Sequence, residues 1–359
     1  MASFATPLRQ SSRSEILEWR FPKPFSHITL TGRSRAAWHT SFVIPQLNLL
    51  LDAGLCVNNL RPKHIFLTHG HSDHTLLTPA FVKREDPPDI FCPAEMKQVL
   101  DNFINANTVL NLGGLWTLGD LESDLSSSDL ESTNSSDSSG SGNGPGDGLL
   151  RTHITHPLVP SQTVTLRRLV GGSGNSAKPS WTATAFSCDH TVPCLGYVFH
   201  QITYKLKPEY RSLSPAELRT LRQSIGSDIT QPVATPVFAF LGDTTALTLD
   251  QNPEVQKWLE EGLKVVITEC SFLREEHRAQ AEKTKHTLWA DLEPIIRRWP
   301  NTTFILMHFS LRYTDEEIRT FFKELGDKVP SNVVVWIDGE GDDEPGLNGG
   351  SGGRSKGKK

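Results

Sequence analysis

The sequence contains no apolar run that approaches the roughly 18 consecutive residues needed to cross a bilayer. Its first twenty residues lack the continuous hydrophobic segment of a secretory signal peptide. No two of the five cysteines have Cys-x-x-Cys spacing, so neither a disulfide framework nor a zinc finger is indicated. These absences predict an intracellular protein with no membrane partner. We expect a cytoplasmic location, and the start of the chain, which contains serine and arginine, leaves nuclear and mitochondrial locations open.

Neither sign of charge predominates, because the formal net charge is only −5 over 359 residues. A generally basic surface that coats nucleic acid is therefore excluded, and any contact with a polyanion has to be local. Residues 120–149 are rich in serine, glycine and acidic residues and are predicted to be a disordered insert. Residues 338–359 are predicted to be a disordered tail, and residues 1–27 an N-terminal extension. One domain is expected from 28 to 337.

The remaining sequence alternates short β-like runs with helical patterns, and the strands outnumber the helices. Pro93 is expected at the start of a helix over 93–106. Ser214, Pro215 and Glu217 form the start signal of another helix, with serine as N-cap and glutamate three residues later. Several predicted strands end in a polar residue followed by a loop. The pattern favours an α+β fold, an αββα sandwich of two packed β-sheets with outer helices and a site at one edge.

Residues 65–75 read IFLTHGHSDHT, in which an apolar run ends in three histidines and an aspartate. In an extended segment His69 and His71 point the same way and can bind one ion. Asp73 and His74 follow in a turn, where they can face a second ion. Imidazole and carboxylate ligands suit zinc, and an open coordination position can activate water. The alternative interpretation is a polar surface loop.

Three later segments supply further ligands at predicted strand ends. His190 lies in SCDHTVPCLGY, Asp243 in AFLGDTTAL and His308 in FILMHFSLRY. A carboxylate at position 243 could bridge two cations. A lone histidine at a strand end is more often structural than a ligand, but loops at neighbouring strand ends can converge. Together with the histidine cluster, these segments predict a metal centre.

The His-x-His-x-Asp-His motif resembles that of the metallo-β-lactamase superfamily, whose members include thiolester hydrolases, β-lactamases, oxidases, phosphodiesterases and nucleases. Further motifs are similar to those of the tRNase Z family, the tRNA 3′-processing endoribonucleases, in its short plant-type form. These motifs are GDTT (242–245), HFSLRY (308–313), and His190 followed by Gly196 and Tyr197, with YKLKPEY, GSDIT, ITECSFL, KHTLW and AWHTSFVIPQLNLLLDAG in support. The resemblance covers residues 28 to 337 apart from the serine-rich insert.

The resemblance implies a zinc-dependent endoribonuclease that removes the 3′ trailer of pre-tRNA. It implies two Zn²⁺ ions per subunit, with Mn²⁺ or Fe²⁺ as alternatives, and Asp243 as the bridging ligand. One ion would be held by His69, His71 and His190, and the other by Asp73, His74 and His308. Asp73 is also expected to be catalytic, and His286 to be the general acid. Glu269 would orient His286, although Thr268 and Cys270 replace the histidine and alanine of the family's His-Glu-Ala-Thr segment.

The segments expected to bind substrate match the family's sequence pattern less closely. The short arm at 198–235 lacks the Gly-Pro-rich signature of long-armed members, although it carries several basic residues. Substrate contacts are expected from the arm and from the segment after His308, at Lys205, Lys207, Arg211, Arg312 and Tyr313. The resemblance also implies a homodimer. Two alternatives remain: a phosphodiesterase of the same fold for a small or cyclic nucleotide, and a non-catalytic scaffold, which the complete set of ligands disfavours.

Overall fold

The computed structural model describes residues 3–7, 16–57, 60–111, 113, 150–170 and 180–339. The predicted insert at 120–149 lies outside these described residues, as does the predicted tail beyond residue 339. The description below concerns the described residues alone.

The first sheet contains eight strands and is antiparallel at one end and parallel at the other. Strands β1 to β5 pair antiparallel in succession, and β5 to β8 pair parallel. The strand order is β8 (Ile154–Leu158), β7 (Asp89–Pro93), β6 (His64–Phe66), β5 (Leu49–Leu51), β4 (His39–Ile44), β3 (Thr29–Arg35), β2 (Leu17–Arg20), β1 (Ser3–Pro7).

The second sheet has a parallel half followed by an antiparallel half. Strands β15 to β12 pair parallel, and β12 to β9 pair antiparallel. Its order after β1 is β15 (Val333–Asp338), β14 (Thr303–Met307), β13 (Val265–Glu269), β12 (Thr230–Phe240), β11 (Leu195–Leu206), β10 (Ser180–Ser187), β9 (Thr163–Leu166).

Strand β1 belongs to both sheets and corrects the predicted domain boundary. Ser3 and Phe4 pair with β15, whereas Thr6 and Pro7 pair with β2. Residues 3–7 and 17–20 are therefore part of the domain, and assigning all of 1–27 to an extension was wrong. The short strand β1 carried too weak a sequence signal to be recognised without its partners.

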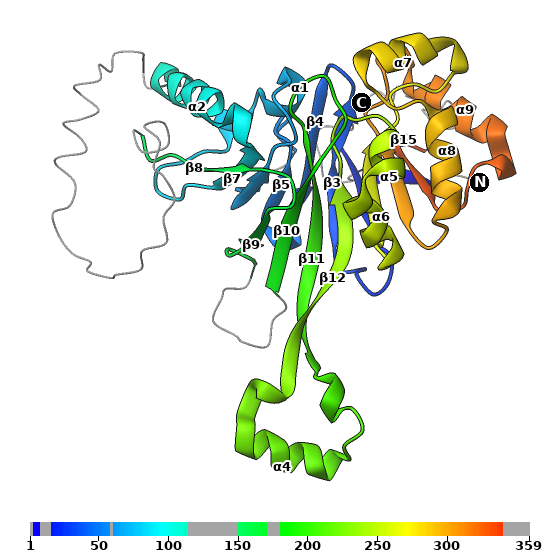
Figure 1. The fold of residues 1–359 in the computed structure, drawn as a ribbon. Coiled ribbons are helices and arrows are strands. Elements are labelled where there is room, and N and C mark those ends of the chain that lie inside the picture. The colour runs from blue at the N-terminus through cyan, green and yellow to red at the C-terminus, as the bar shows by residue number, and fades with distance from the viewer. Residues whose placement is uncertain are drawn as a thin grey trace, which may run out of the picture.

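Helices cover the outer faces of the two sheets, which confirms the αββα sandwich (Figure 1). On one side of the sandwich, α2 (Lys97–Asn111) packs on the first sheet. On the opposite side, four helices pack on the second sheet. These four are α5 (Leu247–Gln251), α6 (Pro253–Glu260), α8 (Trp289–Arg298) and α9 (Asp315–Leu325). The other α-helices of the described residues are α1 (Ser72–Thr75), α4 (Pro215–Ile225) and α7 (Arg278–Thr284). Pro93 ends β7 with extended backbone, so α2 begins later than predicted, at Lys97.

The core between the sheets is built by side chains that alternate along each strand. Leu49 and Leu51 of β5 face the second sheet, and Leu50 between them faces α2. Phe42 of β4 meets Trp336 of β15 across the layer, with ring centroids 5.1 Å apart. Both rings are fully buried, so this contact helps to fix one sheet against the other.

Strands β11 and β12 extend beyond the sheet as a ribbon that carries α4 at its tip (Figure 1). This ribbon with α4, residues 198–235, is called the arm below. The predicted helix start is confirmed, because Ser214 and Glu217 form a reciprocal capping box with Pro215 at the first helical position. None of the α4 residues is buried, so the tip of the arm presents its side chains to solvent.

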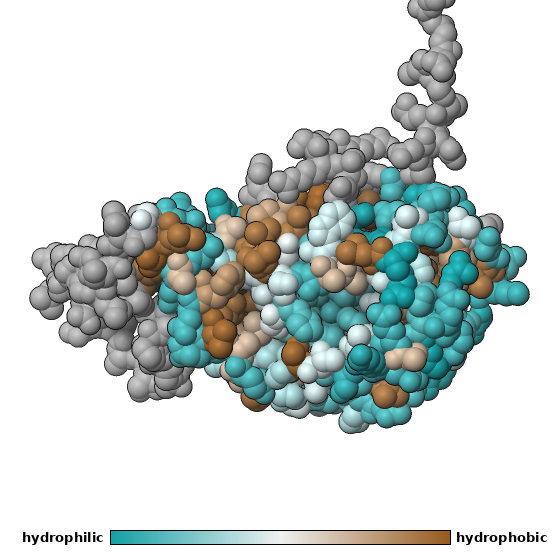
Figure 2. Space-filling view, turned by 90° about the horizontal axis from the view of Figure 1, so that it is seen from above, coloured by the Kyte–Doolittle hydropathy of each residue, from teal (hydrophilic) through white to brown (hydrophobic). Residues whose placement is uncertain are grey.

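Surface polarity is uneven when the molecule is seen from above (Figure 2). The end that carries α7 to α9 is mostly hydrophilic, and hydrophobic residues gather more toward the opposite end. Val99 and Leu110 on α2 are 70% and 69% exposed. Within the described residues, no helix combines the length and apolar character that a membrane span requires.

Candidate metal centre

The predicted ligands converge at one edge of the sandwich, at the carboxyl ends of strands from both sheets. His69 follows β6, His190 follows β10, and Asp243 follows β12. Gly242 has φ of 65°, and a Cβ there would lie 2.6 Å from the Thr68 side chain. Glycine is therefore required for the turn that brings Asp243 against the histidine loop.

One group of potential ligands consists of His69, His71, His190 and Asp243, whose ligand atoms all lie within 4.8 Å of one another. Nε2 of His69 is 3.0 Å from Nδ1 of His71, which is 3.4 Å from Nε2 of His190. Oδ2 of Asp243 lies 3.6 Å from His69 Nε2. Three ring nitrogens and one carboxylate oxygen therefore face a common point.

A second group consists of Asp73, His74 and His308. Nε2 of His308 is 3.4 Å from Oδ2 of Asp73 and 3.3 Å from Nε2 of His74. Oδ1 of Asp243 lies 3.3 Å from Nε2 of both His74 and His308, while its Oδ2 faces the first group. Asp243 thus contacts both groups, and the structure brings together all seven predicted ligands in the predicted division.

Hydrogen bonds on the outer side of the histidines orient their inner nitrogens. Nδ1 of His74 lies 2.7 Å from Oδ2 of Asp52, and Nδ1 of His69 lies 3.0 Å from Oγ1 of Thr68, which donates to Asp52. Protons on these Nδ1 atoms leave each Nε2 lone pair directed inward, as metal ligation requires. Ser271 holds Nδ1 of His308 in the same way, at 3.1 Å.

Electrostatics at the first group favour neutral rings. Burial lowers the pKa of His69 far below its usual value and also lowers the pKa values of His71 and His190. Neutral imidazole is the form that binds a metal. Oδ1 of Asp243 is buried and has no hydrogen-bond partner, an arrangement that costs free energy unless a cation completes it. The residues present therefore fit metal ions.

His286 lies beside the ligands and is held by Glu269. Nδ1 of His286 is 2.7 Å from Oε1 of Glu269, and its ring stacks on that of His308 with centroids 5.5 Å apart. Glu269 is fully buried and also accepts from the backbone N–H groups of Thr244 and Thr287. Four donors, including the Ser271 hydroxyl, fix this carboxylate in place. Glu269 therefore contacts His286 through a carboxylate that is held rigidly.

The residues predicted to contact substrate fall in three different environments. Arg312 is exposed, and its guanidinium carbon lies over the Phe272 ring, 5.0 Å from the ring centroid. Tyr313 is 6% exposed, and its hydroxyl is bonded to the Leu273 N–H and to His277. The Tyr313 side chain packs in the core under the loop, and its contact with substrate stays a prediction. Lys205, Lys207 and Arg211 lie on the arm, away from the centre.

Sequence reasoning did not assign a role to several residues that support the site. Asp52 is one, although its place directly after an apolar strand was a usable signal. Its φ of 54° aims the carboxylate at Thr68 and His74. The backbone N–H of Ala37 donates to Oδ2 of Asp73 at 2.8 Å, a contact that no side-chain pattern could reveal.

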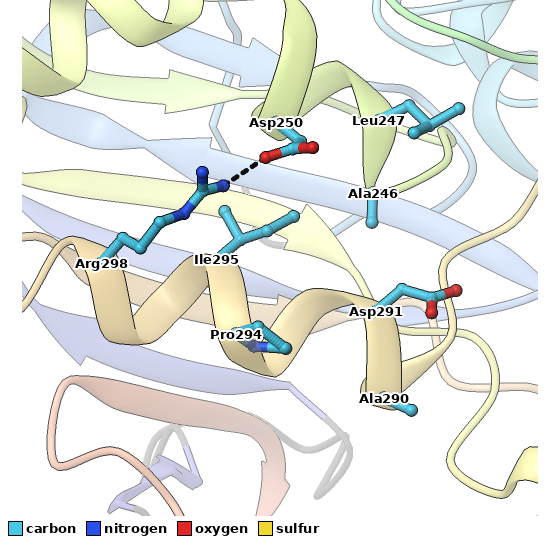
Figure 3. Close-up of a pocket in the computed structure, with 8 residues that line it drawn as sticks. All are labelled: Ala246, Leu247, Asp250, Ala290, Asp291, Pro294, Ile295 and Arg298. Carbon is cyan, nitrogen blue, oxygen red and sulfur yellow. Dashed lines mark hydrogen bonds and ion pairs between the residues drawn. The ribbon is translucent and has the colours of Figure 1, made fainter.

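A separate hollow lies between α5 and α8 (Figure 3). Leu247, Pro294 and Ile295 line it, and an ion pair between Arg298 and Asp250 closes one side. None of the predicted ligands lines this hollow, so it does not belong to the metal centre.

Known proteins are similar to this chain in sequence and in structure. Residues 51–164 match the metallo-beta-lactamase superfamily. Two curated relatives from Arabidopsis thaliana are tRNase Z TRZ2, chloroplastic, and tRNase Z TRZ1, which are 26% and 25% identical over 319 residues. Each alignment covers 86% of this chain, with 75% of the first relative and 95% of the second. A solved structure of human tRNase Z, short form, aligns over 86% of this chain and 95% of its own at 14% identity and a TM-score of 0.43. The chain is thus similar to tRNase Z proteins over 86% of its length, and residues 51–164 carry the metallo-β-lactamase match.

Proposed function

We propose that this protein is a zinc-dependent endoribonuclease that removes the 3′ trailer of pre-tRNA. The observation that carries the proposal is the placement of His286, held by a buried carboxylate, directly beside seven metal-ligand side chains. The names of the relatives, tRNase Z and ribonuclease Z, support the same activity.

The ligand groups are suited to two Zn²⁺ ions. His69, His71 and His190 would hold one, Asp73, His74 and His308 the other, and Asp243 would contact both. Bound zinc would supply an activated water and stabilise negative charge on the reacting phosphate. Asp73 contributes by its position, since Ala37 and His308 fix its carboxylate at the inner face of the centre.

His286 provides the proton that the leaving ribose oxygen needs. Burial lowers the pKa of His286, but the adjacent Glu269 carboxylate outweighs burial and raises it to about 9. The ring is therefore protonated near neutral pH and can act as a general acid. Nδ1 is held by Glu269, which leaves Nε2 to face the substrate.

The arm is suited to a distant part of the RNA. Residues 204–230 hold five basic and three acidic side chains, in a chain whose net charge is −5. Lys205 lies ten residues along β11 from Leu195, which corresponds to about 33 Å at about 3.3 Å per residue. Lys205, Lys207 and Arg211 therefore cannot contact the nucleotide cleaved at the metal centre of the same chain. We propose that they bind RNA phosphates elsewhere on the substrate, with the second subunit of a homodimer cleaving it.

The compartment is part of the proposal. The five cysteines, all within the described residues, form no disulfide, which agrees with a reducing environment such as the cytoplasm.

The test uses two substrates, a 3′-extended pre-tRNA and bis-(p-nitrophenyl) phosphate, each with and without a chelator. Metal-dependent cleavage of the RNA at one position, after the discriminator base, is expected. Asp73→Ala should abolish it, while the matched control Asp250→Ala, outside the centre, should retain it. Turnover of the small diester alone would replace the proposal with a phosphodiesterase for a small or cyclic nucleotide. No metal-dependent turnover of either substrate would exclude both activities.

A further inference from the structure

Lys285 occupies a backbone conformation that a lysine rarely adopts. It ends α7 with φ of 52° and ψ of 53°, in the left-handed region where glycine is the usual residue. It directly precedes His286. A non-glycine residue keeps this conformation only where the surrounding structure holds it.

The Lys285 side chain pairs with Asp189, which directly precedes the metal ligand His190. Nζ of Lys285 lies 2.7 Å from Oδ1 of Asp189. The other oxygen, Oδ2, accepts a hydrogen bond of 2.8 Å from the Thr245 hydroxyl. The Asp189 N–H lies 3.1 Å from Oγ1 of Thr244 and 3.0 Å from Oγ1 of Thr248. Asp189 is therefore held in place by threonines of the segment that follows Asp243.

A second contact runs in parallel between the same two loops. Nδ1 of His190 lies 3.2 Å from the carbonyl oxygen of Lys285, so a proton on Nδ1 leaves Nε2 facing the metal centre. The His190 and His286 ring centroids are 5.2 Å apart. The loop of the general acid and the loop of a metal ligand are thus joined through both the side chain and the backbone of Lys285.

The start of α7 is anchored independently. Arg278 forms hydrogen bonds of 2.9 and 3.0 Å to the two oxygens of Asp291, at the start of α8. Asp291 appears on α8 in Figure 3. The Lys285–Asp189 pair therefore fixes the opposite end of the helix, next to His286. Both side chains are partly exposed, so their ion pair adds little to overall stability, and its effect is local.

We propose that the Lys285–Asp189 ion pair is a positioning device that holds His286 over the metal centre, an inference that rests on the proposed function. It predicts a specific pattern of substrate dependence. A ribose leaving group needs the proton of His286, whereas p-nitrophenolate leaves without one. Loss of the pair should therefore impair RNA cleavage much more than hydrolysis of bis-(p-nitrophenyl) phosphate.

The experiment compares Lys285→Gly, Asp189→Asn, their combination, and the charge exchange Asp189→Lys with Lys285→Asp. Glycine suits the left-handed backbone, so Lys285→Gly removes the ion pair without adding strain. Aspartate also tolerates this conformation, so the exchange can restore the pair. Lys257→Ala, which breaks an exposed ion pair on α6, is the matched control. The measurements are single-turnover rates on both substrates, bound zinc, and amide hydrogen exchange of residues 284–288.

Each single variant should slow pre-tRNA cleavage by about tenfold to a hundredfold, as expected for a misplaced catalytic group. Hydrolysis of the small diester and zinc content should stay close to wild type. The combined variant should be no slower than the slower single variant, and the charge exchange should recover part of the rate. Hydrogen exchange at 284–288 should be faster in the variants that lack the pair.

Two results would overturn the inference. If both rates fall together with zinc content, the pair supports only His190. If rates and hydrogen exchange match those of Lys257→Ala, the pair is merely a surface contact. If the wild-type enzyme cleaves no pre-tRNA, the proposed function fails separately, and the hydrogen exchange of 284–288 still decides whether the pair orders this loop.

Discussion

Nδ1 of His286 lies 2.7 Å from Oε1 of Glu269, and this contact joins the loop that carries His286 to the buried end of β13. Both oxygens of Glu269 are also bonded to groups on neighbouring loops, so the carboxylate cannot rotate away. The contact fixes the orientation of the imidazole ring and stabilises its protonated form. The position of His286 beside His190 and His308 follows from it.

Replacing His286 by alanine should affect pre-tRNA cleavage more than hydrolysis of the small diester. Pre-tRNA cleavage should fall by about 10² to 10⁴, the usual contribution of a general acid. Hydrolysis of bis-(p-nitrophenyl) phosphate should change much less, because its leaving group needs no proton. Single-turnover rates on both substrates measure this, with the exposed His27→Ala as control. Equal losses on the two substrates would mean that His286 acts on the metal centre and not as an acid.

Asp52 should control metal affinity although it is not among the ligands. Its carboxylate holds Nδ1 of His74 and receives two donors from Thr68. Asp52→Asn should weaken zinc binding by about 10- to 100-fold, as is usual when the partner of a metal-binding histidine is lost. Competition with a chromogenic chelator measures the affinity, and Asp250→Asn, in an exposed ion pair, is the control. An unchanged affinity would show that His74 keeps its orientation without Asp52.

Most of the fold was predictable because its strands carry continuous apolar runs that end in polar residues. The strands around Phe66, Phe240 and Met307 were recognised for this reason. Strand β1 was not, because a strand of five residues gains its stability from partners distant in sequence. Its partner β15 lies at the other end of the domain in sequence, and a local sequence pattern cannot reveal such a distant contact.

The candidate metal ligands were predictable because each is a histidine or aspartate in a segment that follows an apolar strand, and these segments meet at one edge of the sheets. The burial of Tyr313 was not predicted, because the motif HFSLRY does not show which of its side chains turns inward. His308 has φ of 60°, and this local conformation changes the direction of the residues that follow. Ala37 was missed because its contribution is a backbone N–H group.

Acid should destabilise the protein through His200 on β11. Burial lowers the pKa of His200 to about 4, below the 6.5 of an exposed histidine. As pH falls from 6.5 toward 4, the unfolded chain binds a proton that the folded chain does not, so stability decreases. Between pH 7.5 and 5.0 this accounts for roughly 2 kcal/mol. Urea unfolding at both pH values should show a smaller loss for His200→Gln than for wild type. An equal loss in both proteins would count against this assignment.

Removing three basic side chains from the arm should weaken RNA binding without changing the rate of the chemical step. Lys205, Lys207 and Arg211 lie on a ribbon that extends away from the metal centre, and replacing all three by serine leaves the seven ligands untouched. KM for pre-tRNA should rise about tenfold, and binding should become less sensitive to salt because fewer counterions are released from the RNA. The rate on bis-(p-nitrophenyl) phosphate should equal that of wild type. Titrations at several salt concentrations measure the slope, and replacing Lys83, an exposed lysine outside the arm, is the control for general charge. If the slope and KM are unchanged while the protein remains folded, the RNA does not contact these side chains, and substrate binding depends on the edge around Arg312 instead.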